Sequence, residues 1–383
     1  VGRAEVAASP PLVVSRVLVW TAHAPNFDYA NFALGVVRFA PADHQPHPPG
    51  YPGVILVAKA LAGLTPVRAL QVTALVGSLA ALLGAYLLGR RLGGEAGGLW
   101  AAGLLTLQPV FWYSGVTSPT RVYLAAGVCW LLYLLGELAA GRDRLLWIAA
   151  VSLAVVGGFR PELPVLFAAP FVLAARRGGH AWRSIGAAAL AGIAAGLPWV
   201  LWLGASFGSL SRLVYIYYHY FLHHASTTSA LLGAPAPAWQ SLIRDTLLWN
   251  GPPAALALLA WLFGGRLAPA AGFGRLAGMY LAPALTIQLV FHLAPDAPDH
   301  TLGTVATLTV LAGALAGAAR LVWLPAAGVT ALLGVSLAAP GTLSPDLDIL
   351  SVRSFAAAQR PVAEMIGGVR ASVRAGDAIV VLH

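Results

Sequence analysis

Long apolar runs, separated by short polar or glycine-rich turns, make up most of this chain. A helix of about 20 apolar residues crosses the hydrocarbon core of a bilayer, so each such run is a candidate membrane span. The segment FRPELP separates the two shortest runs and predicts a tight hairpin between them. The pattern predicts an all-α polytopic membrane protein with about ten transmembrane helices, over residues 67–89, 94–113, 120–140, 145–159, 162–176, 184–206, 241–264, 276–294, 301–319 and 321–340.

The composition agrees with this assignment. Hydrophobic residues make up 58% of the chain and charged residues only 10%, and the mean hydropathy is +0.77. A soluble domain carries about 25% charged residues, and a domain of this length has too little interior to hide so much apolar surface. A soluble globular protein is therefore excluded, and membrane lipids are the expected surroundings. Cys129, the single cysteine, forms neither an internal disulfide nor a zinc cluster.

The charged residues are distributed unevenly. The 23 basic residues, of which only Lys59 is a lysine, exceed the 14 acidic residues and give a net charge of +9. In a polytopic protein such an excess indicates topology rather than binding to nucleic acid, because cytoplasmic turns collect Lys and Arg. We expect a plasma or inner membrane as the location. If 67–89 runs from outside to inside, the arginine-rich turns all lie on the cytoplasmic face of that membrane. That face carries Arg90 and Arg91; Arg142 and Arg144; Arg176, Arg177 and Arg183; Arg266 and Arg275; and Arg320.

This topology divides the chain into an outer segment over residues 1–66, a transmembrane domain over 67–340 and an outer C-terminal segment over 341–383. The apolar run 50–65 carries Lys59 and is too short to cross the membrane, so we expect a helix lying in the outer interface. The C-terminal segment predicts an amphipathic helix, a Gly-Asp turn and a β-strand, the start of a small outer α/β piece. A short apolar run near the first residue suggests that a transmembrane helix or signal anchor precedes it.

The outer segment collects polar residues in FDYANFALGVVRFAPADHQPHPPGYP, residues 27–52. Asp28 is either a solvated loop residue or a general base held in a half-dry cavity. Pro48 and Pro49 fix the backbone after His47, which suits a preorganised site but also an ordinary connector. The spacing of the Asp and His residues matches no known ligand pattern, so no metal site or other cofactor is predicted and a divalent cation is not indicated.

An Asp at the start of an outer segment that ends in HPPGYP resembles the membrane glycosyltransferases of the GT-C type. These include the protein O-mannosyltransferases and the aminoarabinose lipid A transferases, and the likeness extends to glycosyltransferase family 39. Asp28 matches the catalytic Asp of that group, and His47, Pro48 and Pro49 match its second motif. A departure is Tyr29, which stands where the group has a second acidic residue. Three later segments agree, namely YLLGRRLGG at 86–94, GGFRPELPVLFAAPFVL at 157–173 and PDHTLGTVATLTVLAG at 298–313.

The resemblance implies an inverting glycosyltransferase that moves a sugar from a polyprenyl-phosphate donor to a hydroxyl acceptor on a glycan, lipid or protein, at the outer face. It implies that Asp28 is the general base for the acceptor hydroxyl. Cations would bind the donor phosphate, and the candidates are His47, Lys59, Arg160 and Arg212. Arg160 is equally suited to an ion pair with Glu162. The substrate loops are expected to contribute Asp43, His44, Tyr51, Tyr218, His219 and His223.

The last three of these residues lie in SRLVYIYYHYFLHHASTTSALLG, residues 211–233. His219 and His223 are four residues apart and share one face of a helix. The aromatic residues around them indicate an interfacial belt. The same segment would suit a mobile loop that admits the lipid donor and stacks sugar rings.

A transporter or flippase for a lipid-linked sugar is the alternative function. Transporters place charged residues near the membrane midplane, on broken helices. Here Glu137 falls near the inner end of its predicted span, and Gln288 is the main polar residue within a span. The charged residues gather instead at the surface, which favours the enzyme.

Overall fold

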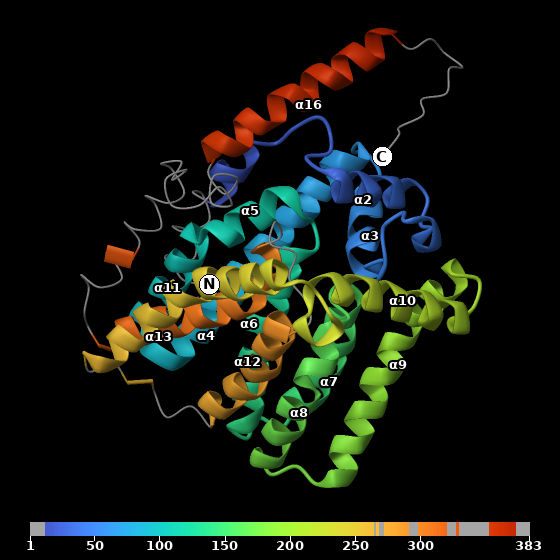
Figure 1. Ribbon diagram of the computed structural model, residues 1–383. Helices are drawn as coiled ribbons and strands as arrows, with labels where there is room; N and C mark the ends of the chain where they lie inside the picture. The colour runs from blue at the N-terminus through green and yellow to red at the C-terminus, as the bar shows by residue number, and fades with distance from the viewer. Residues whose placement is uncertain are drawn as a thin grey trace.

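The computed structural model describes residues 12–263, 266–267, 272–290, 298–319, 327–328 and 352–372. This part of the chain is mainly helical. It also contains an isolated antiparallel β-bridge between Ala40 and Gln45. Figure 1 shows the helices, which are α2 Phe27–Val37, α3 Pro52–Lys59, α4 Pro66–Leu107, α5 Pro109–Thr117, α6 Arg121–Ala139, α7 Leu145–Phe159, α8 Glu162–Arg177, α9 Trp182–Ser206, α10 Leu210–Thr228, α11 Ala236–Leu262, α12 Phe273–Val290, α13 Leu302–Ala318 and α16 Val352–Ser372. Short 3-10 helices occur at η1 Pro41–Asp43, η2 Ala230–Leu232 and η3 Pro298–Thr301.

Membrane-spanning character is found where the apolar runs predict it. Among the described residues, four helices are long and apolar enough to cross a bilayer, namely α4, α6, α9 and α12. Helices α7 and α13 are apolar but shorter. The α7–α8 hairpin turns at Arg160 and Pro161, inside the predicted FRPELP segment. The polytopic all-α class is thus confirmed. The predicted run 321–340 lies largely outside the described residues, so the count of about ten spans stays a prediction.

The prediction of one continuous span over 94–113 is wrong. Helix α4 leaves helical geometry at Gly93 and Gly94, resumes, and ends at Leu107. Gln108 is extended, with φ −64° and ψ 118°, and α5 begins after it. The cause is Pro109, because the proline ring disfavours the helical conformation of the residue before it.

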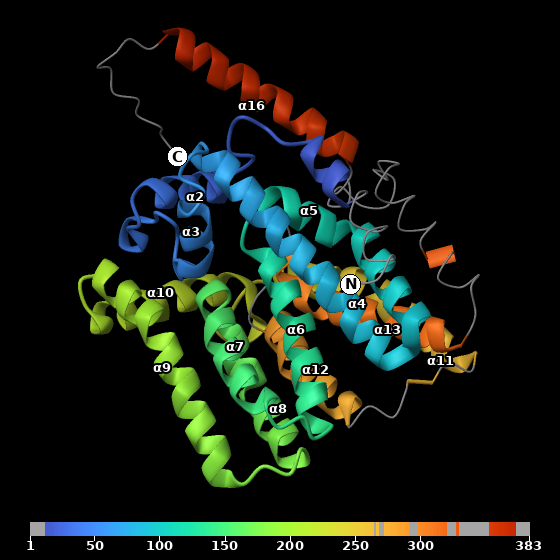
Figure 2. The ribbon, with the colours of Figure 1, turned by 180° about the vertical axis from the view of Figure 1, so that it is seen from behind.

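Small residues let α4 and α13 pack with their backbones close together (Figures 1 and 2). A Cβ atom added at Gly317 or Gly313 would collide with the backbone of α4, and one added at Gly93 would collide with the backbone of α13. Glycine at helix crossings permits such close approach, which is the main source of helix association within lipid.

The arginine-rich turns gather at one end of the helices. Arg142 pairs with Glu137 at 2.7 Å, and Arg91 pairs with the same carboxylate. The guanidinium of Arg177 fills the space beside Gly272. The α7–α8 turn and the outer segment lie at the opposite end (Figure 2). The predicted separation of two faces is therefore present, and their assignment to inside and outside stays a prediction.

The outer segment forms a small folded layer over that opposite end. Tyr29 and Phe32 of α2 share a core with Ile55 of α3, and Gln71 Nε2 donates to the carbonyl of Thr21 at 2.9 Å. Helix α3 has only 8 residues, far fewer than the roughly 20 needed to cross a bilayer. The predicted interfacial position of 50–65 is consistent with this length.

Helices are present in two segments outside the predicted spans. Most of the 211–233 segment is the 19-residue helix α10 rather than a mobile loop. Ser209 caps its start, because the Ser209 side chain accepts a hydrogen bond from the Arg212 backbone N–H. Within the C-terminal segment the expected amphipathic helix is α16, and the strand predicted after it lies outside the described residues.

Candidate functional site

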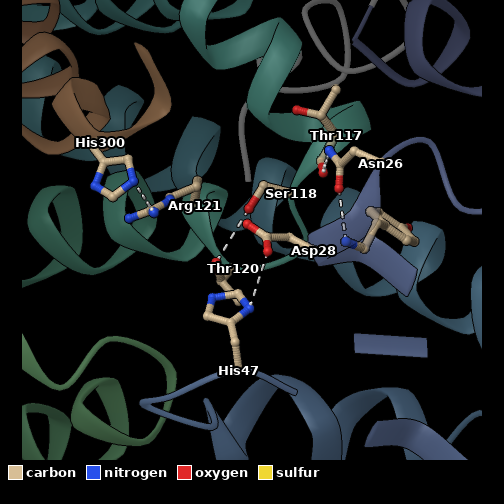
Figure 3. Close-up of polar contacts among 9 residues, drawn as sticks. Asn26, Asp28, His47, Thr117, Ser118, Thr120, Arg121 and His300 are labelled. Atoms are coloured by element: carbon tan, nitrogen blue, oxygen red, sulfur yellow. Dashed lines mark hydrogen bonds and ion pairs between the residues drawn. The ribbon is translucent and has the colours of Figure 1, made fainter. Parts of the chain in front are cut away.

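Asp28 lies in the first turn of α2, where its position is fixed by a cap. Asn26 Oδ1 accepts a hydrogen bond from the Tyr29 backbone N–H at 2.8 Å, and its Nδ2 donates to the Thr117 carbonyl at 3.0 Å (Figure 3). The cap therefore joins the start of α2 to the end of α5. A carboxylate is also favoured at this position by the helix dipole. The Asp28 side chain remains 67% exposed, so it is accessible to a substrate.

His47 approaches Asp28 from the HPPGYP motif. Its Nδ1 lies 3.6 Å from Asp28 Oδ1, slightly too far for a direct hydrogen bond (Figure 3). The imidazole packs edge-on against the rings of Phe32 and Tyr51, with centroid distances of 5.3 and 5.8 Å. Burial lowers the pKa of His47 to about 4, against the opposing charge of Asp28. The imidazole is therefore neutral at pH 7.

A polar cavity of about 330 Å³ opens beside this pair. We call it the Arg121 cavity, and it is lined by Asp28, His47, Ser118, Thr120, Arg121 and His300, among others. Arg121 Nη2 lies 2.5 Å from His300 Nε2 (Figure 3). A guanidinium has no acceptor, so His300 Nε2 accepts and the ring proton sits on Nδ1. A permanent cation thus shares the cavity with a carboxylate.

A second cavity of about 600 Å³ also borders Asp28 and is lined by residues of α10. We call it the α10 cavity. Helix α10 is tied to the HPPGYP motif because the Tyr217 hydroxyl donates to the Pro49 carbonyl. Asp28 and His47 line both cavities. Other side chains lining the α10 cavity are His44, Tyr215, His219, Tyr220, His223 and His224.

Several predicted site residues are brought together in this way. Asp28, His44 and His47 meet two of the three histidines of α10, His219 and His223, around one cavity. The buried ring of Tyr51 packs against the imidazole of His47.

Arg160 is placed differently from the prediction of a phosphate ligand. Its guanidinium is buried, pairs with Glu162 and lies 5.4 Å from the centroid of the Tyr51 ring. Arg160 lines neither cavity. The predicted ion pair between Arg160 and Glu162 is present. It positions Arg160 over the ring of Tyr51, which in turn packs against His47.

Four predicted residues lie outside both cavities. Lys59 Nζ reaches the Val37 carbonyl at 3.4 Å instead. Asp43 forms an exposed pair with Arg38 at 2.8 Å. Arg212 lies in the first turn of α10, away from the cavity lining. Tyr218 is 59% exposed and packs edge-on against His219, with a centroid distance of 5.6 Å.

Within the described residues, no three side chains of His, Cys, Asp or Glu come together as a group that could hold a metal ion. Arg121 and His300 are the residues that sequence reasoning missed. The sequence pattern treated Arg121 only as the start of an apolar run. Its position directly after the SPT turn, away from the arginine-rich turns, was the available sign that it belongs to the outer face.

No protein-family model matches the chain, and no curated protein matches it in sequence. Among solved structures, the chain is similar to the crystal structure of ArnT from Cupriavidus metallidurans bound to undecaprenyl phosphate. The identity is 16% and the TM-score 0.56, and the match covers 97% of this chain. The chain spans 65% of the length of that ArnT chain. The chain therefore has an ArnT-like polytopic all-α fold.

Proposed function

We propose that this protein is a membrane glycosyltransferase that uses Asp28 as the general base. In this proposal a sugar moves from a polyprenyl-phosphate donor to a hydroxyl acceptor at the outer face of a plasma or inner membrane. The observation that carries the proposal is the position of the Asp28 carboxylate where two cavities meet, one of which contains Arg121. The shared fold with ArnT, whose structure holds undecaprenyl phosphate, supports it.

The donor phosphate would bind in the Arg121 cavity. A planar guanidinium binds phosphate oxygens in a bidentate manner. It also stabilises the charge that develops on the phosphate as the sugar leaves. Because His300 accepts one N–H of Arg121, it orients the guanidinium. Arg121 thus takes the role that the sequence assigned to Lys59 and Arg212, while Arg160 acts through Tyr51 and His47.

The chemical step is a single displacement at the anomeric carbon. The acceptor oxygen forms a bond to that carbon while Asp28 takes the hydroxyl proton. The bond from the anomeric carbon to the phosphate oxygen breaks, and the polyprenyl phosphate leaves with the electron pair. Since the acceptor and the leaving group occupy opposite faces of the sugar, the anomeric configuration inverts. Arg121 supplies the positive charge in this scheme, and no cofactor takes part.

The test compares Asp28→Asn with Asp43→Asn in protein reconstituted in nanodiscs. Asn keeps the size of Asp but removes the base, so transfer by Asp28→Asn should fall by about 10²–10⁴-fold. Binding of the donor should be retained. Asp43 lies in the same outer segment but pairs with Arg38 at the surface, so Asp43→Asn should transfer at nearly the normal rate. The assay follows sugar release from a panel of labelled polyprenyl-phosphate sugars, with membrane extract as the source of acceptors.

The paired design separates catalysis from general electrostatics, because both variants lose one negative charge from the same segment. Equal effects of the two substitutions would assign Asp28 an electrostatic role only. Near-normal transfer by Asp28→Asn would remove it from the mechanism. In proteoliposomes, movement of the lipid-linked sugar across the membrane without transfer would favour a flippase.

A further inference from the structure

We infer that the acceptor is an uncharged carbohydrate and that it binds in the α10 cavity. This inference rests on the proposed function and names the acceptor that the proposed function leaves open. It is carried by the shape, the aromatic lining and the charge of that cavity.

The position of the cavity assigns it to the acceptor. In an inverting displacement the attacking hydroxyl and the leaving phosphate lie on opposite sides of the anomeric carbon. If the phosphate binds beside Arg121, the acceptor must reach Asp28 from the other side. The α10 cavity meets the Arg121 cavity at Phe27, Asp28 and His47, and its wall comes from α10, which contributes no residue to the Arg121 cavity. Its volume of about 600 Å³ is within the usual range for small-molecule sites, about 300–1,000 Å³.

The lining residues from α10 match the surface of a sugar ring. Two aromatic pairs follow one face of the helix at intervals of four residues. Tyr215 packs on His219 with a centroid distance of 4.2 Å, and Tyr220 packs on His224 at 4.3 Å. A pyranose or furanose ring presents C–H groups on its face and hydroxyls at its edge. Aromatic faces cover the C–H groups, and imidazole and phenol groups both donate to and accept from hydroxyls.

The charge of the cavity disfavours an acidic acceptor. None of the described residues that line it is Arg or Lys, so these residues offer an acceptor phosphate or carboxylate no permanent cation. Two of its five imidazoles are shifted away from the cationic form. Burial lowers the pKa of His47 to about 4, and burial with the neighbouring His223 lowers the pKa of His224. The carboxylate of Asp28 would moreover repel an anion.

The face of α10 away from the cavity explains how the cavity stays separate from lipid. Val214 and Phe221 are exposed and line neither cavity. An amphipathic helix with such a face lies in the membrane interface. Helix α10 therefore forms a wall, with apolar contacts to lipid on one side and the aromatic pairs on the other.

The experiment measures glycan binding by the full chain in nanodiscs, without any donor. Fluorescently labelled protein is applied to an array of neutral and acidic oligosaccharides, and the bound neutral glycans are then titrated in solution. Tyr215→Leu and Tyr220→Leu should each weaken binding by about threefold to tenfold, as expected for the loss of one ring contact. Val214→Ala is the control, because Val214 is an exposed residue of the same helix that lines neither cavity. It should leave the affinity unchanged.

The inference is overturned if neutral glycans do not bind, or if Tyr215→Leu and Val214→Ala bind them equally well. It is also overturned if Ser/Thr peptides or lipid A bind with the same dependence on Tyr215 and Tyr220. Because the donor is absent, the outcome is independent of turnover. Glycan binding with the expected tyrosine dependence but without sugar transfer would refute the proposed reaction and leave the carbohydrate site standing. Transfer to a peptide or lipid A would do the reverse.

Discussion

His47 gives the site a measurable dependence on pH. The pKa of a free histidine is about 6.5, and burial lowers that of His47 to about 4. Between these values the unfolded chain binds more protons than the folded one. The free energy of unfolding therefore rises with pH in this window. Acidification from pH 6.5 to pH 4 should lower the apparent melting temperature, and the contribution of His47 should level off below pH 4.

The variant His47→Phe isolates this contribution from the other titrating groups. Phenylalanine fills a similar volume among the rings of Phe32 and Tyr51 but carries no proton. Melting curves in nanodiscs between pH 7.5 and pH 4 should therefore be flatter for the variant than for the natural protein. Identical pH dependence in the two proteins would contradict the buried, neutral state of His47.

At the scale of single residues, sequence alone could identify Asp28 and His47 because one short motif contains both. It could not identify Arg121 and His300, which are 179 residues apart in the chain and meet only in the folded structure. It also could not reject Lys59 or Arg212. Charge and an outer location made them candidates, whereas the direction of their side chains depends on packing.

The crossing of α4 and α13 is the element in which a single methyl group should matter most. A Cβ atom at Gly317 would collide with the backbone of α4, and overpacking of this kind costs about 1–3 kcal/mol. Gly317→Ala should therefore lower the melting temperature. Gly136→Ala in α6 is the matched control, because no heavy atom lies within 4 Å of its added Cβ.

The control should be neutral or stabilising, since alanine is favoured over glycine within a helix by up to about 1 kcal/mol. Thermal unfolding of the two variants in the same nanodiscs provides the measurement. A similar loss of stability in both would mean that the cost arises from helix propensity or lipid contact rather than from the α4–α13 crossing.

At the scale of elements, apolar runs predicted helix positions well and helix ends less well. The predicted span 145–159 coincides with α7, because charged or proline-containing turns bound it on both sides. In the run 94–113, no charged residue marks the break at Gln108, and Pro109 is the sequence feature that indicates it. Helix α10 was difficult to predict because aromatic and histidine residues have modest helix propensity, so contacts with the HPPGYP motif decide its order.

The whole molecule has two chemically different ends, and their orientation in the membrane can be measured. Ser184 lies beside the arginine-rich turn before α9, and Ser226 lies on α10; both are exposed. Cysteine is nearly isosteric with serine, and the natural Cys129 is buried. In intact cells, an impermeant maleimide should label Ser226→Cys and leave Ser184→Cys unmodified, because arginine-rich turns face the cytoplasm.

Permeabilised cells are the control, in which both cysteines should react. Labelling of Ser184→Cys in intact cells would invert the orientation and place the candidate site at the inner face. The charge pattern predicted the separation of the two ends, because the turns that carry arginine alternate with those that do not. The sequence predicted that residues 21–66 lie at the outer face but not how α2 and α3 fold there, because that fold depends on contacts with α4 and α7.

The two cavities that share Asp28 also determine the order of molecular events. Both cavities border the carboxylate, so in the proposed reaction neither substrate has to depart before the other arrives. Donor and acceptor would then occupy the protein at the same time, and turnover would pass through a ternary complex. The sugar would not be stored on the protein between two half-reactions. Water reaching Asp28 through an unoccupied α10 cavity would be the competing nucleophile, so an acceptor bound there would also protect the donor from hydrolysis.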